Sequence, residues 1–182
     1  KWTSCTGVGG IPDALDTITI NSGVTMTVDT GNPTVAGITM AVPTVANSLI
    51  VATGQTLTNT GNLTYLANTT GNAQGITIQG TGVLATTGTG IIPAPTGAGD
   101  SSLLCSGTTG SVTFGSTLAL TGNSTSTGSA TFNMGTCTLS AAGITLTGGT
   151  NATGKAQIIA STGTVTSTAN GITFAGTAGN AI

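Results

Sequence analysis

Residues Asp16–Asp29 read DTITINSGVTMTVD, and this stretch decides the fold. Isoleucine, methionine and valine alternate with threonine on both sides of a Ser-Gly turn. Apolar/polar alternation over four to eight residues, bounded by glycine, serine and asparagine, is typical of a β-strand with one face buried. The stretch therefore predicts two short strands joined by a turn.

The same phrase recurs along the chain. It reads GITM at Gly37–Met40, GITI at Gly75–Ile78, GITL at Gly143–Leu146 and GITF at Gly171–Phe174. Self-similar units of this kind indicate a stacked architecture. Each isoleucine is expected to be more buried than the threonine after it, in the pairs Ile38/Thr39, Ile76/Thr77, Ile144/Thr145 and Ile172/Thr173.

Composition agrees with an all-β protein. The chain has 182 residues, of which 43 are threonine and 30 are glycine, and no segment of helical length shows a helical period. Threonine and glycine are poor helix formers, whereas threonine suits strands. We expect one all-β repeat domain over residues 1–182, with an irregular loop at 88–102 where Pro93 and Pro95 break the rhythm.

The favoured architecture is a parallel β-solenoid, with a β-sandwich as the alternative. The strands are short, the repeat is self-similar, and the Asn-Gly and Asp-Gly pairs typical of sandwich hairpins are nearly missing, since Asn170-Gly171 is the single such pair. The interval from Gly37 to Gly75 suggests two coils of about 19 residues each. On that basis we expect about nine coils, each of roughly 20 residues.

The opening region adds a family resemblance. Trp2 is followed by IPDALDTITINSGVTMTVD, which resembles the start of right-handed parallel β-helix regions in secreted bacterial and archaeal surface proteins, of the pectin-lyase-like, adhesin type. The matching positions of that family's phrase are Asp16, Ile18, Ile20, Gly23, Met26, Thr27 and Val28. The resemblance lies mainly in the first half of the chain. It implies a parallel β-helix and a secreted or cell-surface setting, and it carries over no catalytic residue.

Charge excludes several classes of function. The net charge is −2, with two lysines, four aspartates, and no histidine, arginine or glutamate. Nucleic acid binding needs clustered Lys and Arg, so no nucleic acid partner is expected. No apolar run is long enough for a transmembrane helix. The chain begins with Lys1, which we interpret as a mature form whose leader has been removed, although a fragment would look the same.

Neither catalysis nor a cofactor is expected. Polysaccharide cleavage, the common activity of β-helices, needs general acids and bases or carboxylate clusters. The only close carboxylate pair is Asp13/Asp16, which we interpret as turn capping. No Cys/His spacing suits zinc.

Three cysteines leave at least one without an intrachain partner. Cys137 shares the parity of Leu139 and should point into the core. Cys105 and Cys137 lie one or two coils apart, so they form the favoured pair if there is an intrachain disulfide. Glycans are a further candidate partner, at the four N-x-S/T sequons Asn62, Asn68, Asn123 and Asn151.

Three non-enzymatic functions remain. The favoured one is a structural subunit of an extracellular filament, pilus or sheath, because a solenoid leaves unpaired strand edges at both ends and this chain carries little charge to blunt them. The partners would be copies of the chain itself. The expected assembly residues are Trp2, Cys5, Ile18, Ile20, Ile172, Phe174 and Ile182.

A fragment of an adhesin is one alternative. The other is an ice- or carbohydrate-binding solenoid that presents Thr-x-Thr pairs. Such pairs occur at Thr17/Thr19, Thr25/Thr27, Thr56/Thr58, Thr136/Thr138, Thr145/Thr147 and Thr164/Thr166. Their intervals are far from one pair per coil, which weighs against an ordered hydroxyl array.

Overall fold

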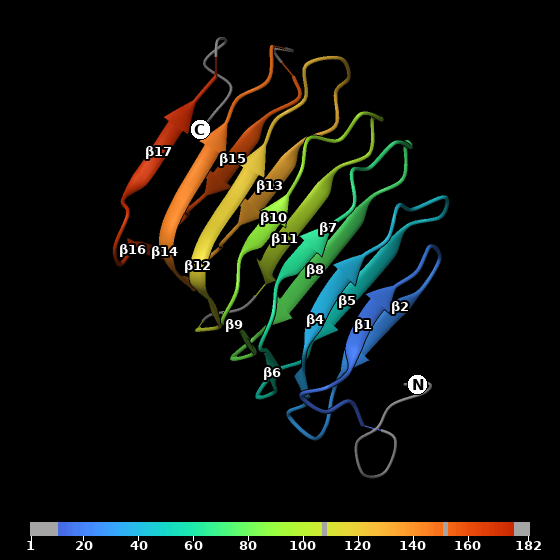
Figure 1. Ribbon diagram of the computed structural model, residues 1–182, viewed down its shortest axis with the longest axis vertical. Coiled ribbons are helices and arrows are strands. Elements are labelled where there is room, and N and C mark those ends of the chain that lie inside the picture. Colours follow the sequence, from blue (N-terminus) through green and yellow to red (C-terminus); the bar gives the residue numbers. More distant parts are fainter. Residues whose placement is uncertain (1–10, 107–108, 151–152, 177–182) are drawn as a thin grey trace.

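The computed structural model describes residues 11–106, 109–150 and 153–176 (Figure 1). These residues contain seventeen strands and no helix. All the strand pairs are parallel, and each strand stacks on one from the previous turn of the chain. The fold is therefore a parallel β-solenoid, as the sequence predicts.

Three faces run along the solenoid. Face 1 contains β1 (Thr17–Ile20), β4 (Gly37–Met40), β7 (Leu63–Tyr65), β10 (Gly90–Ile92), the second halves of β12 (Ser111–Thr121) and β14 (Thr138–Thr147), and β17 (Ile172–Ala175). Face 2 contains β2 (Thr25–Val28), β5 (Asn47–Val51), β8 (Gln74–Gln79), β11 (Ser101–Ser106), β13 (Ala130–Asn133) and β15 (Ala156–Ile159). Face 3 contains β3 (Thr34–Val35), β6 (Thr56–Asn59), β9 (Val83–Thr86), the first halves of β12 and β14, and β16 (Thr164–Ser167).

Faces 1 and 3 form one continuous eleven-stranded sheet, and face 2 is a separate six-stranded sheet. The two faces join because β12 and β14 run from face 3 into face 1 without a break in the strand. The pairing of β12 with β14 shifts register between Phe114 and Thr117, where the chain turns from one face to the other.

Inward side chains form ladders that run the length of the core. On face 1, one ladder contains Ile18, Ile38, Leu63, Gly90, Leu118, Ile144 and Ile172, and the next contains Ile20, Met40, Tyr65, Ile92, Leu120, Leu146 and Phe174. Apolar residues stacked at the strand spacing of about 4.8 Å bury one another. In every coil, the apolar residues of the alternating sequence therefore face the core. β1 and β17 lie at opposite ends of this stack (Figure 1).

The expected exposure pattern holds for three of the four repeats. Ile38, Ile76 and Ile144 are buried, and the threonines that follow them are partly exposed. Ile172 breaks the pattern because it is 43% exposed. It lies on β17, which pairs only with β14, so no described strand covers its other side.

The coils are fewer and longer than expected. On face 1 the first coil takes the chain from Ile18 to Ile38, and every later coil is longer, as between Gly90 and Leu118 or between Ile144 and Ile172. The expectation of nine short coils is therefore wrong. Seven strands in face 1 are separated by six strand spacings, which makes the stack about 29 Å long.

The interval 88–102 is not an irregular loop. It contains β10 on face 1 and the beginning of β11 on face 2. Only residues 93–100 connect them, and comparable connections join face 1 to face 2 in the neighbouring coils. Pro93 and Pro95 lie in this connection, where they need not donate to a ladder.

Two adjustments fill the core around aromatic rings. Gly90 stands in a ladder of isoleucine and leucine because a side chain there would meet the ring of Phe114. Tyr65 is buried, and its hydroxyl donates a 2.7 Å hydrogen bond to the carbonyl oxygen of Ser102. Burial raises the pKa of Tyr65 far above its ordinary value, so the phenol stays neutral.

Candidate functional site

The two ends of the solenoid are the first candidate site, because each strand there has one edge that pairs with no described strand. At the C-terminal end, β17 and β16 each pair with β14, and β15 pairs with β13, and none of the three has a second partner among the described strands. At the N-terminal end, β1, β2 and β3 each have one partner among the described strands. Unpaired strand edges are templates for another strand.

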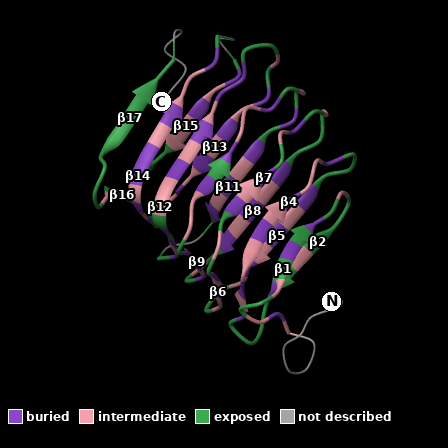
Figure 2. Ribbon diagram, in the orientation of Figure 1, coloured by how far each residue is buried: buried purple, intermediate pink, exposed green. Residues whose placement is uncertain are grey.

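The C-terminal end exposes apolar side chains. All four residues of β17 are exposed, with Ile172 at 43% and Phe174 at 61% (Figure 2). Both lie in line with the inward ladders, so they are core-type side chains that no described coil covers. Ile159 of β15 is also 43% exposed.

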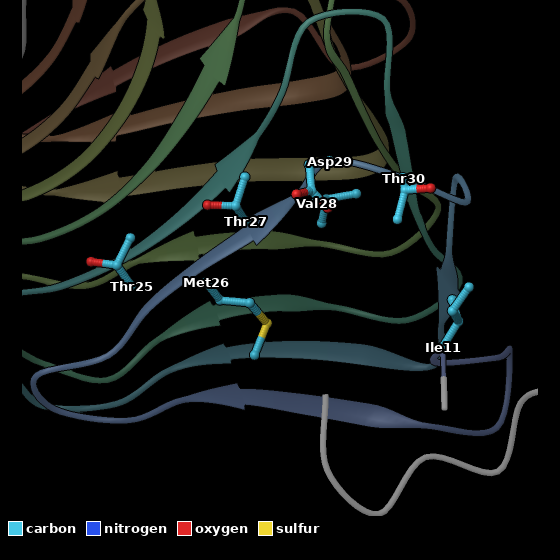
Figure 3. A pocket seen from close by; sticks show the side chains of 7 residues that line it. All are labelled: Ile11, Thr25, Met26, Thr27, Val28, Asp29 and Thr30. Atoms are coloured by element: carbon cyan, nitrogen blue, oxygen red, sulfur yellow. The ribbon is translucent and has the colours of Figure 1, made fainter. Parts of the chain in front are cut away.

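The N-terminal end is more closed. Ile18 and Ile20 point inward and are buried, so their side chains are not exposed at this end, and their place in an assembly interface stays a prediction. A hollow of about 340 Å³ lies beside β2 at this end and is lined by Ile11 and residues 25–30 (Figure 3). Met26 is half-buried beside it. Trp2, Cys5 and Ile182 lie outside the described residues.

The outer surface of face 3 is the second candidate site. Its outward positions on β3, β6, β9, β12, β14 and β16 are in register from coil to coil. Nine of these eleven positions carry a hydroxyl group: Thr34, Thr56, Thr58, Ser111, Thr113, Thr138, Ser140, Thr164 and Thr166. Val83 and Ala85 occupy the other two.

Because of this register, the uneven spacing of Thr-x-Thr pairs along the sequence does not weigh against an ordered hydroxyl array. Those pairs belong to different faces: Thr17/Thr19 and Thr145/Thr147 lie on face 1, and Thr25/Thr27 lies on face 2. On face 3, serine replaces one threonine of the pair in two coils. Counting serine and separating the faces gives one hydroxyl pair per coil, in four of the five coils from β6 to β16.

Two of the sequons serve the fold and are too buried to carry a glycan. Asn68 and Asn123 are at most 2% exposed. The side-chain oxygen of Asn68 accepts hydrogen bonds from the backbone N–H and the hydroxyl of Thr70, at 3.0 and 3.1 Å. Asn123 and Thr125 make the same pair of bonds, at 2.6 and 3.1 Å. The Asn-x-Thr pattern is here an Asx turn.

The remaining sequons differ. Asn62 is exposed, although its side-chain oxygen accepts a 2.9 Å hydrogen bond from the backbone N–H of Thr89. Its amide nitrogen is the atom that a glycan would modify, so Asn62 stays a candidate. Asn151 lies outside the described residues.

Cys105 and Cys137 form a disulfide, with Cα atoms 6.0 Å apart. Cys105 lies near the end of β11, and Cys137 follows β13 in the next coil, so the bond joins two stacked coils where face 2 turns toward face 3. Both cysteines are buried, and Cys137 points inward as its parity with Leu139 suggests.

Asp13 and Asp16 form a turn before β1. The backbone N–H of Asp13 donates a 3.0 Å hydrogen bond to a carboxylate oxygen of Asp16. The backbone N–H of Leu15 donates a 2.9 Å hydrogen bond to a carboxylate oxygen of Asp13. This is the capping arrangement inferred from the sequence. Within the described part of the chain, no three His, Cys, Asp or Glu residues gather where a metal ion could be held.

The described residues include no helix able to cross a membrane. No family model, curated protein or solved structure matches the chain. The resemblance to adhesin-type β-helix proteins is therefore supported at the level of fold alone. The ends and the outer faces of the solenoid are the features that bear on function.

Proposed function

We propose that this protein is a non-enzymatic structural subunit of an extracellular filament, pilus or sheath, in which copies stack end to end. The observation that carries the proposal is the exposed Ile172 and Phe174 on a strand whose second edge pairs with no described strand. Pairing that edge with another copy would add backbone hydrogen bonds and bury apolar surface together. A head-to-tail contact that does not close produces a filament.

Two further features support the proposal. A net charge of −2 provides little repulsion between copies. The Cys105–Cys137 disulfide suits an oxidising compartment, which fits an extracellular protein. If the chain belongs to a larger adhesin, the neighbouring coils of that protein would cover the same edges instead.

The test is polymerisation of variants at the C-terminal edge. Phe174→Asp places a charge on the exposed end, and deletion of residues 171–182 removes β17. Both are expected to abolish filaments in electron micrographs and in sedimentation, because the contact would lose its apolar anchors. Leu66→Asp is the matched control, since Leu66 is 44% exposed but lies on the side of the body after β7.

Leu66→Asp should polymerise like the unmodified chain. Circular dichroism of each variant shows whether the solenoid itself is intact. If the deleted or Phe174→Asp chain still forms filaments as well as the unmodified chain, assembly through this edge is wrong.

A second candidate function follows from face 3. We propose that its hydroxyl rows bind ice, an uncharged hydrogen-bonding lattice. Neighbouring rows are about 4.8 Å apart, and the two hydroxyls within one strand about 6.7 Å apart, so the face presents a rigid two-dimensional array. The outward residues of face 3 carry no charge, and only Val83 and Ala85 among them are apolar. Face 2 is more apolar on its outer side, where Ile50, Leu104 and Ile159 point outward.

The corresponding experiment measures the gap between melting and freezing temperatures of small ice crystals. Thr113→Tyr puts a large ring in the middle of face 3 and is expected to remove any such gap. Ala119→Tyr is the control, because Ala119 points outward from face 1. The absence of a gap for the unmodified protein contradicts ice binding, and retention by Thr113→Tyr contradicts the role of face 3. Adsorption to crystalline cellulose instead would assign the face to a polysaccharide.

A further inference from the structure

The outer surface of face 2 is used by neither of the functions proposed above. Its six strands form one layer of the solenoid (Figure 1). Because these strands are stacked in register, their outward side chains form two rows along the solenoid. The first, which we call the ridge row, contains Thr27, Ile50, Thr77, Leu104, Asn133 and Ile159. The second, which we call the small row, contains Thr25, Ser48, Gly75, Ser102, Thr131 and Gln157.

Large apolar side chains occupy every second coil of the ridge row. Ile50, Leu104 and Ile159 stand in these coils, and smaller polar side chains occupy the coils between them. Since coils are about 4.8 Å apart, successive large residues are about 9.6 Å apart. Ile50 and Leu104 are partly exposed, and Ile159 is 43% exposed. The space between two of them can therefore receive an apolar side chain from another molecule.

The ridge row is complementary to a reversed copy of itself. When a second row is laid over the first in the opposite direction, with the midpoint between Thr77 and Leu104 in common, every large apolar residue meets a smaller one. The facing pairs are Ile50/Asn133, Leu104/Thr77 and Ile159/Thr27. Large residues from the two rows then alternate along a single apolar seam.

We propose that face 2 is a self-association surface, on which two copies pack face to face with their solenoids antiparallel. A two-fold axis parallel to the strands relates the copies, so both use the same surface. The large apolar side chains of the two ridge rows interdigitate and bury one another. This contact uses the side of the solenoid, and it is separate from the end-to-end contact proposed above.

No charge has to be buried in this contact. None of the described strands contains a charged residue. The charged residues of the described part of the chain are Asp13, Asp16, Asp29, Asp100 and Lys155. Asp29 directly follows β2, and Asp100 and Lys155 directly precede β11 and β15, so these three lie at the rim of face 2. An apolar centre with a polar rim is the usual anatomy of a protein interface.

Several polar groups of the small row already have partners within the chain. The hydroxyl of Ser48 donates a 3.0 Å hydrogen bond to that of Thr25, and the side-chain amide of Gln157 donates a 3.1 Å hydrogen bond to the hydroxyl of Thr131. Covering polar groups that are already hydrogen-bonded costs less than covering free ones. The small row can therefore pack beside the apolar seam at little cost.

The size of face 2 sets the strength of the contact. The face is about 24 Å long and about 15 Å wide, so each copy contributes about 360 Å². Stable complexes bury about 800 Å² per partner, and a pair of single copies is therefore expected to be weak and transient. Copies stacked end to end would repeat the contact along two filaments and strengthen it by multivalency. Side-by-side association of filaments, as in a sheath, follows if both contacts form.

Chemical cross-linking of single copies tests the surface and its register. Ser102→Cys is introduced into a chain that also carries Cys5→Ser and Phe174→Asp, which removes the native free thiol and the end-to-end contact. In the antiparallel pair the two Ser102 Cα atoms lie about 11 Å apart, one coil along the seam and one sheet spacing across it. A short bis-maleimide at high protein concentration is expected to give covalent dimers.

Gln157→Cys in the same background is the register control. Gln157 lies in the same row, but at its end, so the two Gln157 Cα atoms of an antiparallel pair are about 26 Å apart. Only single chains are expected. Equal dimer yields from Ser102→Cys and Gln157→Cys would overturn the antiparallel register, because parallel copies would bring both positions close to their equivalents.

A charge in the middle of the ridge row tests the apolar seam. Leu104→Asp, added to the Ser102→Cys chain, is expected to lower the dimer yield about tenfold or more, because it removes a central apolar contact and buries a carboxylate. Ile91→Asp is the matched control: Ile91 is 38% exposed and points outward from face 1, so the yield should not change. Circular dichroism shows whether each variant is folded.

The outcomes separate this proposal from end-to-end assembly. The absence of dimers from the folded Ser102→Cys chain overturns the association through face 2, whether or not the unmodified protein forms filaments. If the Ser102→Cys thiol is then also unreachable for a monofunctional maleimide, another part of the same chain covers the face. Dimers from Ser102→Cys without filaments from the unmodified protein support face 2 and overturn assembly through the ends.

Discussion

Replacing Cys105 and Cys137 together by alanine is expected to lower the free energy of unfolding by about 3–4 kcal/mol. The two cysteines have a sequence separation of 32, and a bond across a loop of that length restricts the unfolded chain by about this amount. In the folded state the bond joins two stacked coils, and each sulfur lies in a side chain that is at most 2% exposed. The measurement is urea unfolding of the variant against the unmodified protein.

Thiol counting provides the control for this prediction. The denatured, unreduced protein should show no more than the single thiol of Cys5, and Cys5→Ser should leave the disulfide intact. Three titratable thiols would show that the Cys105–Cys137 bond does not form in solution. A loss of less than about 1 kcal/mol would show that the bond restricts the unfolded chain far less than its loop length implies.

The direction of side chains in the strands could be predicted from the sequence, because that direction is a local property. In a strand, neighbouring side chains point to opposite sides, so a phrase such as Ile38-Thr39-Met40 shows which residues are buried. Among the four GIT phrases the prediction fails only at Ile172, where burial depends on whether another coil covers the strand. That coverage is a tertiary property, which an alternation of two residues cannot encode.

Coil length could not be predicted in the same way. The GIT phrases at Gly37 and Gly75 look alike, yet the first lies on face 1 and the second on face 2. Their separation is therefore one coil plus the step to the next face, and not two coils. A strand's sequence reports burial on one side, but it does not report which of three faces the strand occupies.

The same ambiguity limits the prediction of the candidate sites. Thr-x-Thr pairs counted along the chain mix all three faces, which conceals the regular array on face 3. The sequon pattern is also ambiguous, because Asn-x-Thr serves both glycan attachment and the Asx turn. Asn68 and Asn123 each come shortly after a strand that ends on face 1. That position directly after a strand, where a turn is needed, is the signal available in the sequence.

The second large effect is expected from Phe132→Ala, which should lower the free energy of unfolding by about 3–5 kcal/mol. The ring is fully buried in β13 and stacks between Leu103 of β11 and Ile158 of β15. Removal of the ring loses its burial and leaves a cavity lined by three successive coils. Those coils are held by backbone ladders on both sides, so they cannot readily close around the gap.

Thr131→Val is the matched control for Phe132→Ala. Thr131 is the preceding residue of β13 and points outward, where its hydroxyl accepts a 3.1 Å hydrogen bond from Gln157. Its replacement should change stability by about 0.5 kcal/mol or less. Because each coil contacts only its neighbours, Phe132→Ala should also weaken the coupling between the coils on either side. Urea unfolding of that variant is then expected to show a lower slope, or two steps in place of one. A loss below about 1 kcal/mol with an unchanged slope would mean that the coils collapse around the cavity, and that the solenoid is less rigid than its ladders imply.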